Sequence, residues 1–241
     1  MTMRNCSWIR GWLLAAALTT LWAPLCRAQQ ETNWSFSADA TFVNQYLWRG
    51  FVANDSPSFQ PSASFGYKGL TVTSWSNFSY RTPRGQKWTE HDLVVDYTHD
   101  LEDVSLSFGY IFYAFPDVAA GAGNRSHEVY AGIAYNGWLQ PAFTYYRDFD
   151  QGDGDYFYFS VGRSWALGRG AVLNGGLGLG VNNGQWIDNT TVSNFDINVS
   201  VDIPAGRVVF SPFFSQSIGH RTLFGSHNIF GVKMTVVSAS W

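Results

Sequence analysis

The chain alternates apolar and polar residues with a period of two over many consecutive segments. In one of them, Phe195, Ile197 and Val199 alternate with Asp196 and Asn198. Successive side chains of a β-strand point to opposite faces, so this alternation predicts strands with one apolar face and one polar face. The fold therefore has to place a different environment on each side of every strand.

Twelve such segments are predicted, and the connections between them fall into two classes. The segments are residues 34–48, 58–67, 70–80, 90–99, 104–113, 126–135, 138–147, 155–165, 171–181, 192–203, 207–217 and 228–241. Short connections at 68–69, 100–103, 136–137, 166–170 and 204–206 alternate with longer polar ones at 49–57, 81–89, 114–125, 148–154, 182–191 and 218–227. A two-sheet sandwich would also alternate, but it does not sort loop length by parity. We therefore expect an all-β fold, a transmembrane antiparallel up-and-down β-barrel of about twelve strands with periplasmic short turns.

The first 28 residues have the layout of a secretory signal peptide. Arg4 and Arg10 precede a short apolar run, and Cys26 and Ala28 place small residues at the −3 and −1 positions of the expected cleavage site. The run is shorter than the roughly 20 apolar residues that span a bilayer, which argues against a membrane anchor. We expect residues 1–28 to be a signal peptide and residues 29–241 to form the barrel.

Composition narrows the functional class. Cys6 and Cys26 both lie in the expected signal peptide, so disulfides and cysteine-ligated metals are not expected. Cleavage of the signal peptide would remove three arginines and leave 12 basic against 18 acidic residues. This acidic balance argues against a nucleic-acid partner. The chain is 17% aromatic and 14% charged, whereas about 25% charged is usual in soluble domains. An exported, aromatic chain without an apolar helix favours a closed barrel.

The stretch QYLWRGFVAND, at residues 45–55, departs from the simple pattern. Tyr46 and Trp48 share the parity of Phe42, so we expect them in the aromatic girdle at the end of the first strand. Arg49 has the opposite parity and should point to the lumen or the mouth. Gly50 would let the chain turn into a first external loop.

This stretch resembles the opening of the TorF-like porin family, small barrels of Gram-negative bacteria. The residues that carry the resemblance are Tyr46, Arg49, Gly50, Asp55, Pro57 and Gln60. The segments 106–116 and 126–135 are similar to the middle part of that family, and the resemblance covers roughly residues 40–165. It implies a porin-like barrel in the cell outer membrane and no particular substrate.

Most charged residues of the predicted strands occupy the alternate positions that point into the barrel. The expected pore-lining residues are Asp39, Glu90, Asp92, Asp96, Glu128, Asp196, Asp202, Arg207 and Lys233. They either pair within a polar interior or give the lumen a negative potential that favours cations. The expected function is passive diffusion of small hydrophilic solutes, with a possible preference for cations and no cofactor.

Two other functional classes stay open. Some barrels of this size are lipid hydrolases, and the neighbours Ser126–His127 and Ser226–His227 offer the residue types of a nucleophile and a base. Adjacent strand residues point to opposite faces, so such neighbours cannot pair simply, and no catalytic or metal residue is assigned. A plugged structural or adhesion barrel is the other class, because inward aromatic side chains could fill a narrow lumen. They are Trp75, Tyr113, Tyr130, Tyr156 and Tyr158.

The run GGLGLG, at 175–180, contains a loose Gly-x-Gly-x-Gly but lies in a predicted strand, so a dinucleotide site is not expected. Its glycines instead remove side chains from the inner wall, which widens the lumen or lets another group approach.

The expected partners are outer-membrane lipid and lipopolysaccharide, small polar solutes and the barrel-assembly machinery. The assembly signal would be the C-terminal aromatic Trp241.

The first prediction concerns export and architecture. The mature protein should begin near Gln29, fractionate with the outer membrane, and migrate differently on gels before and after heating. Cell fractionation and heat-modifiability on gels check this. Recovery as a soluble periplasmic protein would contradict the barrel.

The second prediction concerns assembly. Deletion of Trp241 should lower the outer-membrane yield severalfold, because the terminal aromatic is expected to be read by the assembly machinery. Quantitative immunoblots of outer-membrane fractions measure this. An unchanged yield would make Trp241 a girdle residue only.

Overall fold

Twelve strands close into one antiparallel barrel in the computed structural model, which describes residues 34–82, 85, 87–119, 123–220 and 223–237. The barrel strands are β1 (Trp34–Val43), β4 (Ser58–Tyr67), β5 (Leu70–Ser79), β6 (Trp88–Leu101), β7 (Val104–Ala114), β8 (Arg125–Tyr135), β9 (Ala142–Asp148), β10 (Gly154–Gly168), β11 (Ala171–Asn183), β12 (Thr190–Ala205), β13 (Val208–Ile218) and β14 (Ser226–Val237). A separate two-stranded sheet contains β2 (Tyr46–Trp48) and β3 (Phe51–Asn54). The predicted fold class and the number of barrel strands are confirmed.

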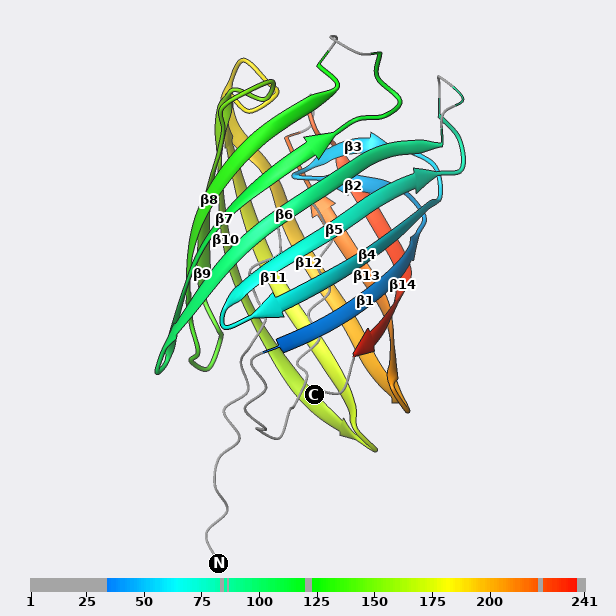
Figure 1. Cartoon of the computed structure of the whole chain (residues 1–241), viewed down its shortest axis with the longest axis vertical. Helices are drawn as coiled ribbons and strands as arrows, with labels where there is room; N and C mark the ends of the chain where they lie inside the picture. The colour runs from blue at the N-terminus through cyan, green and yellow to red at the C-terminus, as the bar shows by residue number, and fades with distance from the viewer. Residues whose placement is uncertain (1–33, 83–84, 86, 120–122, 221–222, 238–241) are drawn as a thin grey trace, which may run out of the picture.

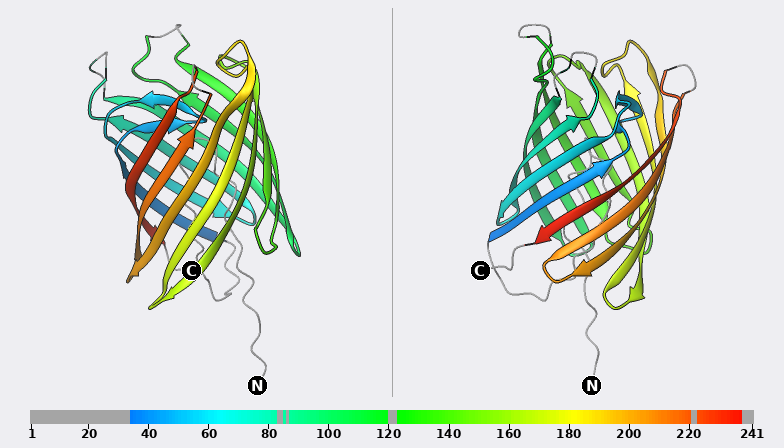
Figure 2. Two further views of the ribbon diagram at one scale, coloured as in Figure 1. Left: turned by 180° about the vertical axis from the view of Figure 1, so that it is seen from behind. Right: turned by 90° about the vertical axis from the view of Figure 1, so that its right-hand side faces the viewer.

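Every barrel strand pairs with its neighbours in the chain, and β1 pairs with β14 to close the ring. The closing register places Ala38 opposite Val236 and Phe42 opposite Val232. Closure leaves no open edge, so the backbone groups of each strand are paired on both sides. The strands are strongly tilted, and β1 begins at the same rim at which β14 ends (Figures 1 and 2).

Loop length sorts by rim as predicted, except that the β8–β9 connection at 136–141 is longer than the β9–β10 connection at 149–153 on the opposite rim. The rim at which β1 begins carries the short turns and is called the short-turn rim; the opposite rim is called the long-loop rim. The turn Lys68–Gly69 joins β4 to β5 with φ of 47° and 87°. Two consecutive positive φ values are characteristic of the turn that matches the twist of a hairpin.

One predicted turn is wrong. Asn136–Gly137 was expected to be a two-residue hairpin turn, but β8 ends at Tyr135 and β9 begins at Ala142. Pro141 lacks an N–H and cannot donate to a ladder, although its carbonyl accepts from Tyr135 N at 2.9 Å. The pairing therefore continues regularly only beyond the proline.

The outer face of the barrel is a band of exposed apolar side chains. Examples are Phe108, Phe159, Leu177, Val199 and Phe230, which are 42–58% exposed. So extensive an apolar surface is unfavourable in water and matches the lipid-facing band of an outer-membrane barrel. Near the short-turn rim, Trp34 stacks on Tyr67 with ring centroids 4.0 Å apart.

The inner face is polar and aromatic, and glycines of β11 make room for its tyrosines. A Cβ atom on Gly178 would lie 2.0 Å from Tyr158 Oη, and one on Gly180 would lie 2.3 Å from Tyr156 Oη. The expectation that these glycines let another group approach is correct, and the group is the tyrosine on the neighbouring strand β10.

The first loop does not follow the prediction. The first barrel strand ends at Val43, and Tyr46 and Trp48 belong to a hairpin, β2–β3, that lies inside the long-loop end of the barrel (Figures 1 and 2). Asn44 and Gln45 hold the bend by donating side-chain hydrogen bonds to Asn228 O at 3.1 and 2.9 Å.

The hairpin turns inward because its apolar side chains find a better environment there. Leu47 is buried in a cluster with Val43, Phe213 and Ile229. Tyr46 is only 3% exposed, so the predicted place of Tyr46 and Trp48 in an external girdle is wrong.

The described residues contain no helix that is long and apolar enough to cross a membrane. The expected signal peptide and the terminal Trp241 lie outside the described residues, so both expectations stay predictions.

Candidate functional site

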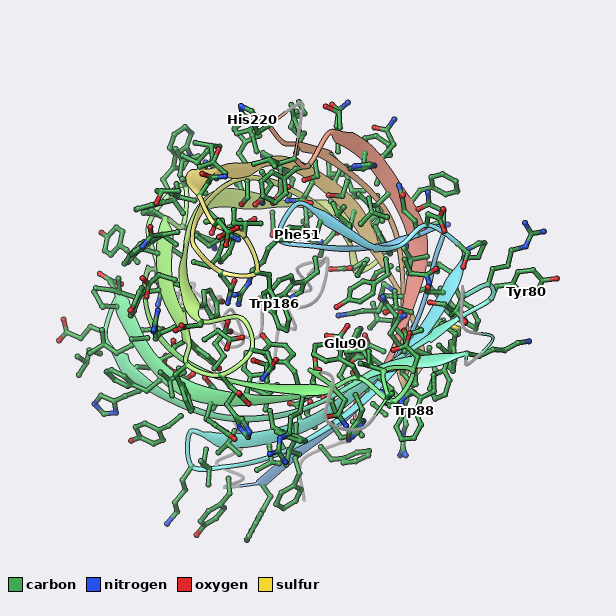
Figure 3. The ribbon with its side chains drawn as sticks, turned by 90° about the horizontal axis from the view of Figure 1, so that it is seen from above. Phe51, Tyr80, Trp88, Glu90, Trp186 and His220 are labelled. Atoms are coloured by element: carbon green, nitrogen blue, oxygen red, sulfur yellow. The ribbon has the colours of Figure 1, made fainter. Side chains whose placement is uncertain are left out.

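The hairpin β2–β3 spans the mouth of the barrel and touches several of its walls. On one side, Tyr46 packs against Trp75 of β5 with ring centroids 5.5 Å apart. At the far end, Phe51 packs edge-on against Phe224 at 4.7 Å. Figure 3 shows the hairpin inside the ring of strands, with Phe51 near its tip and Trp186 beside it. The hairpin therefore narrows the mouth from within.

The hairpin turn consists of Arg49 and Gly50, with φ of 48° and 87°. A Cβ atom at Gly50 would lie 2.5 Å from Ser193 O of β12. A side chain here would therefore meet both backbone strain and a steric clash. Glycine lets the turn approach the barrel wall.

Arg49 projects from this turn into a buried ion pair with the opposite wall. Its Nη1 atom lies 2.7 Å from Glu128 Oε2, and its Nη2 atom lies 2.8 Å from Glu128 Oε1. Nη1 also donates to Gln185 Oε1 at 2.6 Å. The two charged side chains are 2% and 0% exposed. Such a bidentate arginine–carboxylate pair is a strong, charge-assisted contact.

Three aromatic rings surround the same guanidinium. Arg49 Cζ lies 4.6 Å from the ring centroid of Trp48, 4.2 Å from Tyr146 and 4.5 Å from Tyr156. The negative face of an aromatic ring attracts a cation at such distances. Burial by itself lowers the pKa of Arg49, but the neighbouring Glu128 carboxylate outweighs burial and holds the pKa above its ordinary value. Arg49 is therefore a permanent charge.

The partners of Arg49 are themselves held in place. Glu128 also accepts from Tyr113 Oη at 3.1 Å and from Gln185 Nε2 at 2.6 Å. Gln185 lies in the loop between β11 and β12, where its backbone N donates to Asn182 Oδ1 at 2.9 Å. Asn182 Nδ2 donates in turn to Gln185 O at 3.0 Å. The loop thus presents the Gln185 amide to the ion pair.

A second group of carboxylates lies on the inner face of β6. Asp92 is 1% exposed and pairs in register with Trp75 on β5 and Tyr113 on β7. Asp96 is 5% exposed and accepts from Tyr130 Oη at 2.6 Å. Glu90 is buried nearer the long-loop rim and points into the ring in Figure 3.

The opposite wall carries further carboxylates with neutral partners. Asp196 on β12 accepts from Asn194 Nδ2 at 2.6 Å and from Tyr158 Oη at 3.2 Å. Asp202, on the same strand, accepts from Ser211 Oγ at 2.6 Å and Asn174 Nδ2 at 2.9 Å. Neutral donors stabilise these oxygens without cancelling their charge.

The two other expected inward cations have different positions. Lys233 Nζ lies 3.8 Å from Asp39 Oδ1 on the inner face. The predicted inward position of Arg207 is wrong. Arg207 lies exposed in the turn between β12 and β13, because β13 begins only at Val208. It therefore does not line the wall.

The residues that carry the resemblance to the TorF-like family lie partly in the hairpin and partly outside it. Gln60 is buried on β4 and donates to Asn77 Oδ1 at 3.0 Å. Asp55 and Pro57 are exposed in the segment that leads from β3 to β4. The structure thus brings together only Tyr46, Arg49 and Gly50 of the motif in the mouth.

The serine–histidine neighbours do not pair with each other. Ser126 Oγ donates to Asp148 Oδ1 at 2.7 Å, whereas His127 Nδ1 lies 2.5 Å from Tyr110 Oη. His227 Nε2 lies 2.7 Å from Phe224 O. Ser126, His127 and His227 each contact another partner, and adjacent strand residues point in opposite directions.

A cross-strand pair that sequence reasoning did not name joins Ser76 Oγ to His91 Nδ1 at 2.9 Å. The His91 ring also contacts Trp88 edge-on. A serine nucleophile requires a histidine that is oriented by a third polar group. Among the described residues, no hydrogen bond or ion pair joins His91 to a carboxylate. In the described residues no cluster of three or more His, Cys, Asp or Glu is arranged to hold a metal ion.

Sequence reasoning missed the hairpin and Gln185. A usable signal for the hairpin was present, since short apolar stretches flank Arg49–Gly50 and Asn54–Asp55 follows as a second turn. No local pattern pointed to Gln185, because its role depends on a residue 136 positions away in the chain.

Comparisons with known proteins support the fold. No family model matches the chain, and no curated protein matches it either. The chain is similar to an outer membrane channel from Pseudomonas putida F1, at 8% identity and a TM-score of 0.59, over 91% of this chain and all of that one. Lower similarity is found to OmpF from Salmonella typhi, at 7% identity and a TM-score of 0.41, over 85% of this chain and 97% of that one. The first likeness shows that this chain shares the barrel fold of that channel, while the resemblance to the TorF-like family stays a prediction.

The third prediction concerns the ion pair. Removing one partner of a buried pair leaves an uncompensated charge, so Arg49→Ala or Glu128→Ala should each cost about 3–5 kcal/mol of stability. The double variant should cost clearly less than the sum, because neither charge is then left alone. Urea unfolding in detergent, followed by tryptophan fluorescence, measures this cycle.

The matched control is Arg147 with Asp153, which lie 2.7 Å apart but are 37% and 75% exposed. Such an exposed pair should show a coupling of about 1 kcal/mol or less. A coupling between Arg49 and Glu128 no larger than that of the control would contradict the role given to the buried pair.

Proposed function

We propose that this protein is a porin-like channel of the cell outer membrane for small hydrophilic solutes, with β2–β3 as its constriction and a preference for cations. The observation that carries the proposal is a closed barrel with a polar interior and a hairpin folded into its mouth. The similar fold of the Pseudomonas putida outer membrane channel supports it. A relationship to the TorF-like porins is part of the same proposal.

The distribution of charge supports the preference for cations. In the described strands and hairpin, the two inward cations, Arg49 and Lys233, each have a carboxylate partner. Asp92, Asp96 and Asp196 have no such cationic partner within hydrogen-bonding or ion-pair distance in the described residues. In their ionised form these carboxylates give the interior a net negative charge, which low-dielectric walls concentrate.

The structure also supplies an observation for a plugged barrel. Several inward aromatic residues are almost completely buried, among them Trp75, Tyr113 and Tyr130. They lie on β5, β7 and β8, and Tyr46 of the hairpin packs against Trp75. A plugged barrel is therefore the second candidate, and conductance separates it from the channel.

The fourth prediction concerns conduction. The purified protein in planar bilayers should show a cation-selective reversal potential in a potassium chloride gradient. The triple variant Asp92→Asn, Asp96→Asn and Asp196→Asn should shift that potential toward zero, because asparagine keeps the size and removes the charge. The effect should be largest at low salt, since the Debye length falls to about 3 Å at 1 M.

The control is Asp153→Asn, which removes an exposed loop carboxylate and should leave the reversal potential unchanged. Anion selectivity of the unmodified protein would contradict the assignment. Absence of any conductance, in protein shown to be folded by heat-modifiability, would favour the plugged barrel.

A further inference from the structure

The pocket that holds Arg49 has the composition of a receptor for a guanidinium group. We propose that Glu128, Gln185, Tyr146 and Tyr156 form a binding site for guanidinium compounds. Arg49 is its intramolecular occupant, which a solute carrying the same group displaces. As a statement about the solute, this inference rests on the proposed channel function.

The polar part of the site matches a guanidinium and not a simple ammonium. Both Glu128 oxygens accept from the two Nη atoms of Arg49, at 2.7 and 2.8 Å. The Gln185 carbonyl oxygen accepts a further N–H at 2.6 Å. A planar fork of donors satisfies these three acceptors together, whereas an ammonium is a compact point charge.

The aromatic part of the site lies on the barrel wall. Tyr146 on β9 and Tyr156 on β10 are 1% and 2% exposed, and each ring centroid lies within 4.5 Å of Arg49 Cζ. Both rings belong to the buried cluster of the barrel interior. They remain on the wall when the occupant leaves, and they favour a flat, weakly hydrated cation.

The site does not need Arg49 for its shape. Tyr113 Oη and Gln185 Nε2 both donate to Glu128. The Gln185 loop is fixed by Asn182, and Trp186 N donates to Gly152 O at 3.0 Å. A site that is already organised pays less conformational entropy when it binds a ligand.

The occupant, by contrast, lies on a hairpin whose strands are not paired with any barrel strand. The hairpin β2–β3 is a two-stranded sheet of its own and is not hydrogen-bonded into the barrel sheet. Arg49 Nε is buried and has no hydrogen-bond partner in the described part of the chain. A free guanidinium can orient itself in the site without the constraint of the hairpin backbone.

Tethering sets the concentration at which a solute competes. A short flexible tether gives an intramolecular group an effective concentration in the millimolar range. The hairpin is packed against the barrel wall and holds Arg49 more firmly than such a tether, so a free guanidinium has to exceed the millimolar range to displace Arg49 from the unmodified protein. Displacement would release the contact that holds the hairpin turn against β8, so the same event that binds the solute would widen the constriction.

The test is a binding measurement on Arg49→Ala in detergent micelles, with methylguanidinium chloride as the probe and methylammonium chloride as the matched cation. Isothermal titration calorimetry at constant ionic strength should show methylguanidinium binding about tenfold more tightly than methylammonium. The unmodified protein should bind methylguanidinium at least about tenfold more weakly than the variant. Glu128→Gln in the Arg49→Ala background should abolish the selectivity.

The matched control is Arg81→Ala, which removes an exposed arginine that lies beside Tyr80 at the same rim. It should behave as the unmodified protein. Heat-modifiable migration establishes that each variant is folded. If Arg49→Ala does not fold, Arg49→Lys keeps the charge but not the fork, and it should bind methylguanidinium more tightly than the unmodified protein does.

Equal binding of the two cations by folded Arg49→Ala, or no binding of methylguanidinium, would overturn the proposed site. The measurement does not depend on conduction, so the two proposals fail separately. Selective binding without conductance would support the proposed site and contradict the proposed channel. Conductance without selective binding would support the channel and contradict the site.

Discussion

Closure of β1 on β14 is the constraint on which the rest of the structure depends. Every strand has an apolar outer face, and lipid offers no hydrogen-bonding partner for exposed N–H and C=O groups. The pairing of residues 37–43 with 231–237 satisfies the last two edges. Once the ring is closed, the inward side chains have to fill or line a narrow space, and the polar groups among them need partners.

The interior meets this requirement asymmetrically. Buried tyrosines lie on β8, β9 and β10, and the glycines of β11 leave room for the tyrosines of β10. The carboxylates of β6 and β12 accept from tyrosine, asparagine and serine donors. Into this space the hairpin inserts a single arginine, and its charge is matched by Glu128 on the far wall. A buried guanidinium without that carboxylate would be costly, so the two residues determine where the hairpin rests.

Much of the barrel could be predicted because its information is local. Alternation along each strand assigns the inner and outer faces, and loop length assigns the rims. The hairpin turn at Lys68–Gly69 is of this kind. Asn136–Gly137 has an equally strong local signal, yet the structure has a longer turn there, because Pro141 prevents regular pairing up to the turn. Parity predicted that Arg49 points to the lumen or the mouth, and Arg49 does lie inside, but the bend after Val43 and the hairpin turn place it there.

By itself the sequence determined the architecture: a closed, antiparallel barrel of twelve strands with an apolar exterior and an acidic, aromatic interior. Only the tertiary structure decided the contents of the mouth. Tyr46 and Trp48 share the parity of lipid-facing residues, yet the bend held by Asn44 turns them inward. Arg49 finds Glu128 and Gln185 across the barrel, from positions 79 and 136 residues away. Parity describes the direction of a side chain within one strand, whereas these contacts depend on which walls face each other after closure.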